Sequence, residues 1–80
     1  MEQKRRKTDT IELQKKMIEK GYPTIQSLSR ASGVNRNTLG DIVKGRGQPT
    51  YEVMLKIIET LDLSETDAGK IFFAPDLRTA

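Results

Sequence analysis

The spacing of the glycines limits what this chain can fold into. Two stretches with apolar residues at every third or fourth position, a period typical of helices, lie between Thr24 and Gly45 and are separated by Gly33. Glycine is the residue best suited to a turn with positive φ. We therefore predict two short helices joined by a tight turn, the second over residues 35–44.

Helix-capping residues placed before apolar stretches predict helices in the rest of the chain as well. Residues of the type that caps helix N-termini precede five apolar stretches: Asp9, Thr24, Asn35, Thr50 and Ser64. The side chains expected to face inward are Leu13, Met17, Ile18, Ile25, Leu28, Ala31, Val34, Leu39, Ile42, Val43, Met54, Ile57, Ile58, Leu61, Leu63, Ala68, Ile71 and Phe72. No segment alternates as a strand does, so the expected class is all-α.

The 80 residues are enough for one domain. We expect a flexible basic arm over residues 1–8 and a helical domain over residues 9–73. A loose tail over residues 74–80 should follow, because Pro75 prevents further helix.

The net charge of +3 is unevenly distributed along the chain. Residues 4–46 carry eleven basic and four acidic side chains, a net charge of +7, whereas residues 47–80 carry three basic and six acidic ones, a net charge of −3. Such asymmetry suggests a polyanionic partner for the first half. A solvated basic surface gives the same pattern, so charge alone does not decide between them.

The absence of cysteine and histidine excludes several kinds of chemistry. It rules out Cys/His zinc sites, cysteine nucleophiles and Ser-His-Asp triads, and no glycine-rich phosphate loop is present. We expect neither an enzyme nor a metal, cofactor or small-molecule site. Without cysteines, a secretory signal or a membrane-spanning apolar stretch, we expect a cytoplasmic protein that does not enter a membrane.

Residues 28–39 (LSRASGVNRNTL), followed by Ile42, Gly45 and Pro49, resemble the Cro/C1-type helix-turn-helix of phage repressors and xenobiotic-response-element regulators. The resemblance covers residues 11–72. It implies a five-helix, lambda-repressor-like domain whose second and third helices form the helix-turn-helix. The chain departs from the family at Ile25, where glutamine is usual, and at Val43, where glutamate is frequent. Tyr22-Pro23 also lengthens the link between the first two helices.

In this family the side chains that read bases lie in the first turn of the third helix, where this chain has Arg36 and Asn37. Arginine favours guanine and asparagine favours adenine in the major groove. Thr38 is expected to touch DNA or to bond back to its own helix. Asp41 either accepts from cytosine or pairs with Lys44. A close approach to DNA or to a neighbouring helix would explain Gly40, and the sequence does not choose between them.

Phosphate contacts are expected from residues at the helix starts and in the turn after the third helix: Thr24, Asn35, Lys44, Arg46 and Gln48. Four basic residues of the arm, Lys4, Arg5, Arg6 and Lys7, are predicted to contact DNA, although a solubilising tail or an attraction to anionic lipid would use the same residues.

These patterns predict a sequence-specific regulator of double-stranded DNA, a repressor of phage or bacterial type. It would dimerise through its fourth or fifth helix and Phe73. Two other classes remain open. One is a protein-interaction module such as an antitoxin or antirepressor, and the other is an architectural or RNA-binding basic protein.

Overall fold

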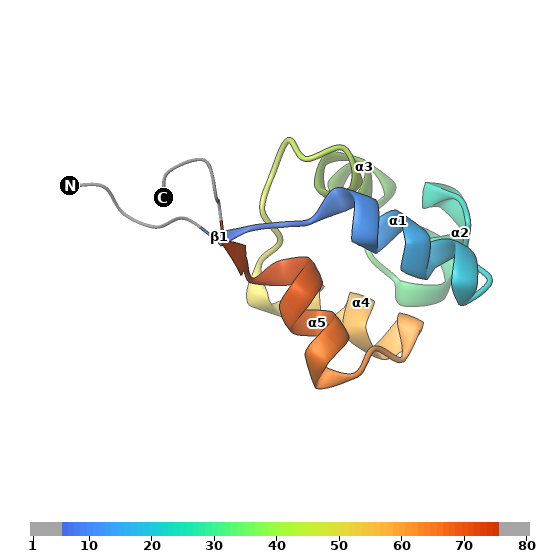
Figure 1. Ribbon diagram of the computed structural model, residues 1–80. Helices are drawn as coiled ribbons and strands as arrows, with labels where there is room; N and C mark the ends of the chain where they lie inside the picture. The colour runs from blue at the N-terminus through green and yellow to red at the C-terminus, as the bar shows by residue number, and fades with distance from the viewer. Residues whose placement is uncertain (1–5, 76–80) are drawn as a thin grey trace.

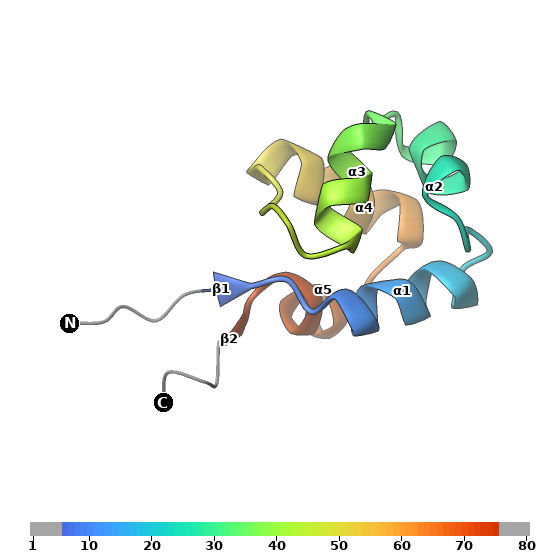
Figure 2. The same cartoon turned by 90° about the horizontal axis from the view of Figure 1, so that it is seen from above.

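A computed structural model describes residues 6–75. This part of the chain forms five helices and two very short strands (Figure 1): β1 (Arg6–Lys7), α1 (Thr10–Glu19), α2 (Ile25–Ser32), α3 (Arg36–Val43), α4 (Tyr51–Leu61), α5 (Glu65–Phe72) and β2 (Ala74–Pro75). Figure 2 shows α1 and α5 together along one side of the molecule, with α2, α3 and α4 on the other. The predicted all-α, five-helix class is confirmed.

Every predicted N-cap is confirmed. The side chains of Asp9, Thr24, Asn35, Thr50 and Ser64 each accept a hydrogen bond from a backbone N–H two or three residues further on. These bonds satisfy amides that have no partner within the helix. Local side-chain chemistry therefore fixes where each helix begins.

Thirteen buried apolar residues drawn from all five helices and their junctions form one core: Leu13, Met17, Leu28, Val34, Leu39, Ile42, Val43, Ile57, Leu61, Leu63, Ala68, Ile71 and Phe72. Tyr22, Ile25, Val53, Met54 and Ile58 are partly buried against it. All thirteen buried residues were expected to face inward. Ile25, Met54 and Ile58 were expected to face inward as well and are partly buried, so the predicted core is largely confirmed.

Two residues predicted to face inward do not. Ile18 is 65% exposed, because it follows Met17 by one residue and is rotated off the stripe that Leu13 and Met17 form on α1. Ala31 is also exposed. The chain turns at Gly33, and Val34 fills this part of the core instead.

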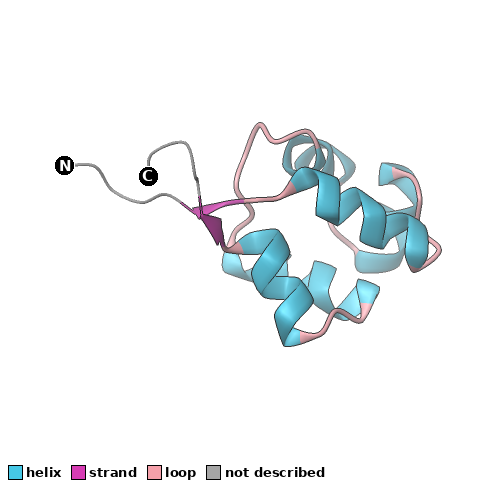
Figure 3. Cartoon of the chain, viewed as in Figure 1, coloured by secondary structure: helices cyan, strands magenta, loops and turns pink. Residues whose placement is uncertain are grey.

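The structure differs from the expected boundaries at both ends. β1 pairs antiparallel with β2, so that Arg6 lies opposite Pro75 and Lys7 opposite Ala74 (Figure 3). Thr8 is buried, and the backbone N–H of Asp9 donates to the carbonyl of Ile71 at 2.7 Å. Residues 6–7 and 74–75 therefore pair with each other and lie against α5, and the backbone of Asp9 bonds the start of α1 to α5. Lys4 and Arg5, also predicted to belong to the arm, lie outside the described residues.

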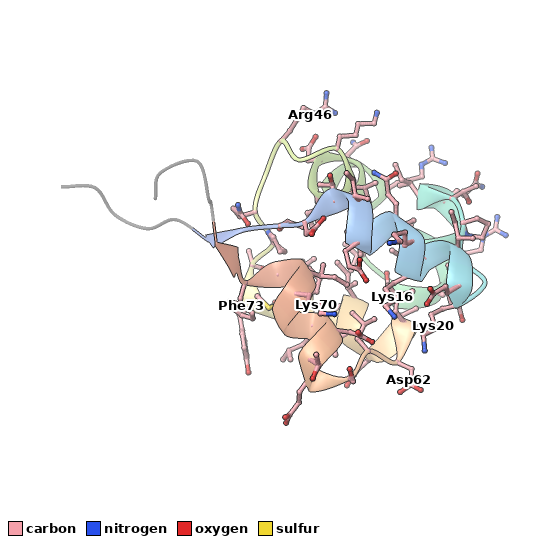
Figure 4. All side chains as sticks on the ribbon, viewed as in Figure 1. Lys16, Lys20, Arg46, Asp62, Lys70 and Phe73 are labelled. Atoms are coloured by element: carbon pink, nitrogen blue, oxygen red, sulfur yellow. The ribbon has the colours of Figure 1, made fainter. Side chains whose placement is uncertain are left out.

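An ion pair links α1 and α5. The Lys16 ammonium of α1 lies 3.3 Å from the Asp67 carboxylate of α5 and 3.3 Å from Glu19. Lys16 reaches from α1 toward α5 (Figure 4). Hydrogen bonds to Glu19 and Asp67 raise the pKa of Lys16.

Candidate nucleic-acid interface

The two faces of α3 differ sharply. Leu39 and Ile42 point into the core and are at most 1% exposed. The four residues predicted to read bases, Arg36, Asn37, Thr38 and Asp41, are all exposed. Helical periodicity therefore places polar side chains on the outer face while the inner face fixes the helix to the domain.

The turn before α3 is held by two serines that the sequence analysis did not single out. Gly33 ends α2 in the left-handed conformation with φ of 80°. The Ser29 hydroxyl donates to the carbonyl of Val34 at 2.6 Å, and the Val34 N–H donates to the Ser32 hydroxyl at 3.2 Å. With Val34 buried, these bonds fix the angle between α2 and α3. A serine near a helix end is common, so the sequence alone gave no reason to choose these two.

Thr24, predicted to contact phosphate, is engaged in a capping box. Its hydroxyl accepts from the N–H of Ser27 at 3.0 Å, and the Ser27 hydroxyl accepts from the N–H of Thr24 at 3.1 Å. The amides of Ile25 and Gln26 have no partner within residues 6–75. At this helix start they are the groups that an anion would meet first.

Asn35 likewise caps a helix, at the start of α3. Its side-chain oxygen accepts from the amides of Asn37 at 2.8 Å and Thr38 at 3.4 Å. The acceptor end of this side chain is therefore used within the protein, and only its NH₂ group is placed to donate to a phosphate.

Asp41 pairs with Arg46, whereas the sequence offered Lys44 as its local partner. The Arg46 guanidinium lies 3.2 Å from the Asp41 carboxylate, and the Arg46 N–H donates to the Asp41 carbonyl at 2.8 Å. Gly45, with φ of 79°, reverses the chain and brings Arg46 back over the last turn of α3. The Lys44 alternative is therefore wrong, and Lys44 is exposed beside the pair.

Gln48 connects the loop after α3 to the segment before α1. The buried hydroxyl of Thr8 donates to the Gln48 side-chain oxygen at 3.2 Å. Gln14 of α1 likewise donates to the carbonyl of Val43 at 3.3 Å, at the end of α3. Both contacts join residues far apart in sequence, so no local pattern could have revealed them.

A shallow hollow opens on the outer surface between α2 and α3. It is lined by Ile25, Arg36, Asn37, Gly40, Asp41, Lys44 and Arg46. Figure 4 shows Arg46 projecting from the loop beside α3, on the side of the molecule opposite Asp62. The structure thus brings three of the four predicted base-reading residues together with two of the predicted phosphate-binding residues, while Thr38, Thr24, Asn35 and Gln48 lie outside the hollow's lining.

Within residues 6–75, no group of three or more His, Cys, Asp or Glu side chains is arranged to hold a metal ion. No helix in this range is long and apolar enough to cross a membrane. Independently of these two findings, the exposed side chains on and beside the outer face of α3 offer hydrogen-bond donors and positive charge, the chemistry that base edges and phosphates require.

Comparison with known proteins adds one finding. A family model described as helix-turn-helix matches residues 13–67, from α1 into α5. No curated protein and no solved structure matches the chain.

Proposed function

Because this chain belongs to the helix-turn-helix family of DNA-binding regulators, we propose that it is a sequence-specific repressor of phage or bacterial type that acts in the cytoplasm. In this proposal α3 enters the major groove of double-stranded DNA. The observation that carries it is the outer face of α3, where exposed Arg36 and Asn37 stand on a helix anchored by buried Leu39 and Ile42.

The first turn of α3 supplies the proposed base contacts. An arginine fork matches guanine O6 and N7, and an asparagine amide matches adenine N6 and N7. Neither Arg36 nor Asn37 has a side-chain partner within the described residues, so both are available to a base. Thr38 lies beside them and is exposed as well.

Phosphate contacts would flank the groove on both sides of α3. Lys44 and Arg46 follow the helix and are exposed, and the amides at the start of α2 lie across the hollow. Arg46 exchanges its partner Asp41 for a phosphate in this proposal. Such contacts fix the position of the protein but carry no direct sequence information.

Dimerisation would use the apolar groups exposed on α4 and after α5. Tyr51 and Leu55 lie one helical turn apart and are 72% and 41% exposed, and Phe73 is 44% exposed. Exposed apolar side chains on a small domain are candidates for an interface. A two-fold dimer would bind half-sites about 34 Å apart.

Selection of bound duplexes from a random pool, followed by affinity measurements at two salt concentrations, tests the proposal. We expect one consensus, read over a few base pairs, and an affinity that falls as salt rises. Salt-sensitive binding without a consensus would instead support an architectural or RNA-binding protein. Weak binding at both salt concentrations, together with a stable protein partner, would support an interaction module.

A further inference from the structure

The hollow between α2 and α3 has an apolar part within its charged rim. Ile25 and Gly40 are the two lining residues without a polar side chain, and Ile25 packs against the core from a partly buried position. Arg36, Lys44 and Arg46 around them carry positive charge suited to a polyanion. Ile25, which stands where glutamine is usual in the helix-turn-helix family, therefore adds an apolar surface to the hollow.

Gly40 is not required by the fold of the protein. Its φ is not positive, and a Cβ added there would meet only the Ile25 Cδ1 atom, at 3.9 Å, which is ordinary van der Waals contact. Alanine would also favour the helix more than glycine does. Packing against α2 therefore does not explain the glycine, whereas the close approach of a ligand to the helix would.

We propose that the space over Gly40 and Ile25 receives the 5-methyl group of a pyrimidine in the major groove. This inference rests on the proposed function. The thymine methyl is the one apolar group that an unmodified base pair shows in that groove. 5-Methylcytosine carries the same methyl group at C5, and the experiment below distinguishes thymine from 5-methylcytosine as its source.

The test compares duplexes that differ by that methyl group alone. In the selected consensus each thymine is replaced in turn by uracil, and each cytosine by 5-methylcytosine. We expect one thymine whose replacement weakens binding about fourfold, the effect of burying one methyl group. If 5-methylcytosine strengthens binding by a similar factor and no uracil matters, the methyl belongs to modified cytosine.

Gly40→Ala provides the test from the protein side, since its new methyl group would occupy the same space. We expect the fourfold preference for the methylated base to fall toward one, with an unchanged salt dependence. Gly69→Ala is the matched control, because Gly69 also lies within a helix and a Cβ there meets nothing within 4 Å. The control should keep the preference.

The outcomes separate this inference from the proposed function. If no consensus emerges, both are overturned. A consensus that binds equally with and without every 5-methyl group overturns the methyl inference alone. An unchanged preference in Gly40→Ala also overturns it alone.

Discussion

The Asp41 carboxylate lies 3.2 Å from the Arg46 guanidinium, and the pair closes the turn that follows α3. A carboxylate on a surface that faces phosphates is repelled by them. Here the positive charge of Arg46 offsets the negative charge of Asp41. Both side chains are more than half exposed, so the pair is expected to contribute less than about 1 kcal/mol to folding. Its importance would lie in binding.

Replacing Arg46 by alanine should weaken binding to all sequences about equally, because a phosphate contact carries no sequence information. The slope of log affinity against log salt should fall by about one. Titrations of the consensus and of a scrambled duplex at several salt concentrations measure both effects.

Lys56→Ala is the matched control for Arg46→Ala, since Lys56 is an exposed cation on α4, outside the hollow. Lys56→Ala should lower the slope of log affinity against log salt less than Arg46→Ala does. A loss confined to one base pair in Arg46→Ala would show that Arg46 reads a base instead of a phosphate.

Replacing Asn37 by alanine should relax specificity at a single base pair. The amide is expected to contribute about 1–3 kcal/mol of discrimination at an adenine. Because Asn37 is exposed, the free energy of unfolding of the Asn37→Ala protein should differ from that of the wild type by less than about 0.5 kcal/mol. Repeating the duplex selection with the variant measures the change, and an unaltered consensus would contradict direct readout by α3.

The helix starts and the turn glycines could be predicted because their causes are local. A side chain such as Asn35 caps the amides two or three residues away, and Gly33 relieves strain within its own residue. The inner face of α3 followed from helical periodicity for the same reason.

Contacts between distant segments could not be predicted in this way. The hydrogen bond between Thr8 and Gln48 joins residues 40 positions apart. Closer in sequence, the choice of Arg46 over Lys44 as the partner of Asp41 depends on the backbone reversal at Gly45. Ile18 was misplaced because an apolar residue at a helix edge fits the periodic pattern nearly as well as one that is buried.

Replacing Asn35 by alanine should destabilise the protein by about 0.5–2 kcal/mol, because the amides of Asn37 and Thr38 lose their acceptor. Urea unfolding measures the loss. The neighbouring Asn37→Ala is the matched control, since it removes an asparagine side chain that caps nothing. Equal stability losses in the two variants would contradict the capping role.

Acid should weaken the link between α1 and α5. Partial burial tends to raise the pKa of Asp67, but the hydrogen bond and charge of Lys16, helped by the Ser64 hydroxyl and the Lys70 charge, outweigh it and leave the pKa below its ordinary value of 3.8. A carboxylate with a lowered pKa in the folded state stabilises the protein above pH 3.8, and this contribution is lost as the pH falls through the folded pKa.

The pKa of Lys16 is raised instead. Its contribution to stability is therefore complete below pH 10.5 and is lost only as the pH rises through the folded pKa.

Melting temperatures of the wild type and Asp67→Asn, measured across this pH range, test the assignment. The wild type should be more stable at neutral pH, and the difference should shrink as the pH falls from 3.8 through the lower folded pKa of Asp67, below which both chains carry a neutral group at position 67. Asp62→Asn is the matched control, because Asp62 is exposed at the end of α4 and forms no ion pair within residues 6–75. A difference between wild type and Asp67→Asn that stays constant into strong acid would mean that the carboxylate's charge does not hold α1 to α5.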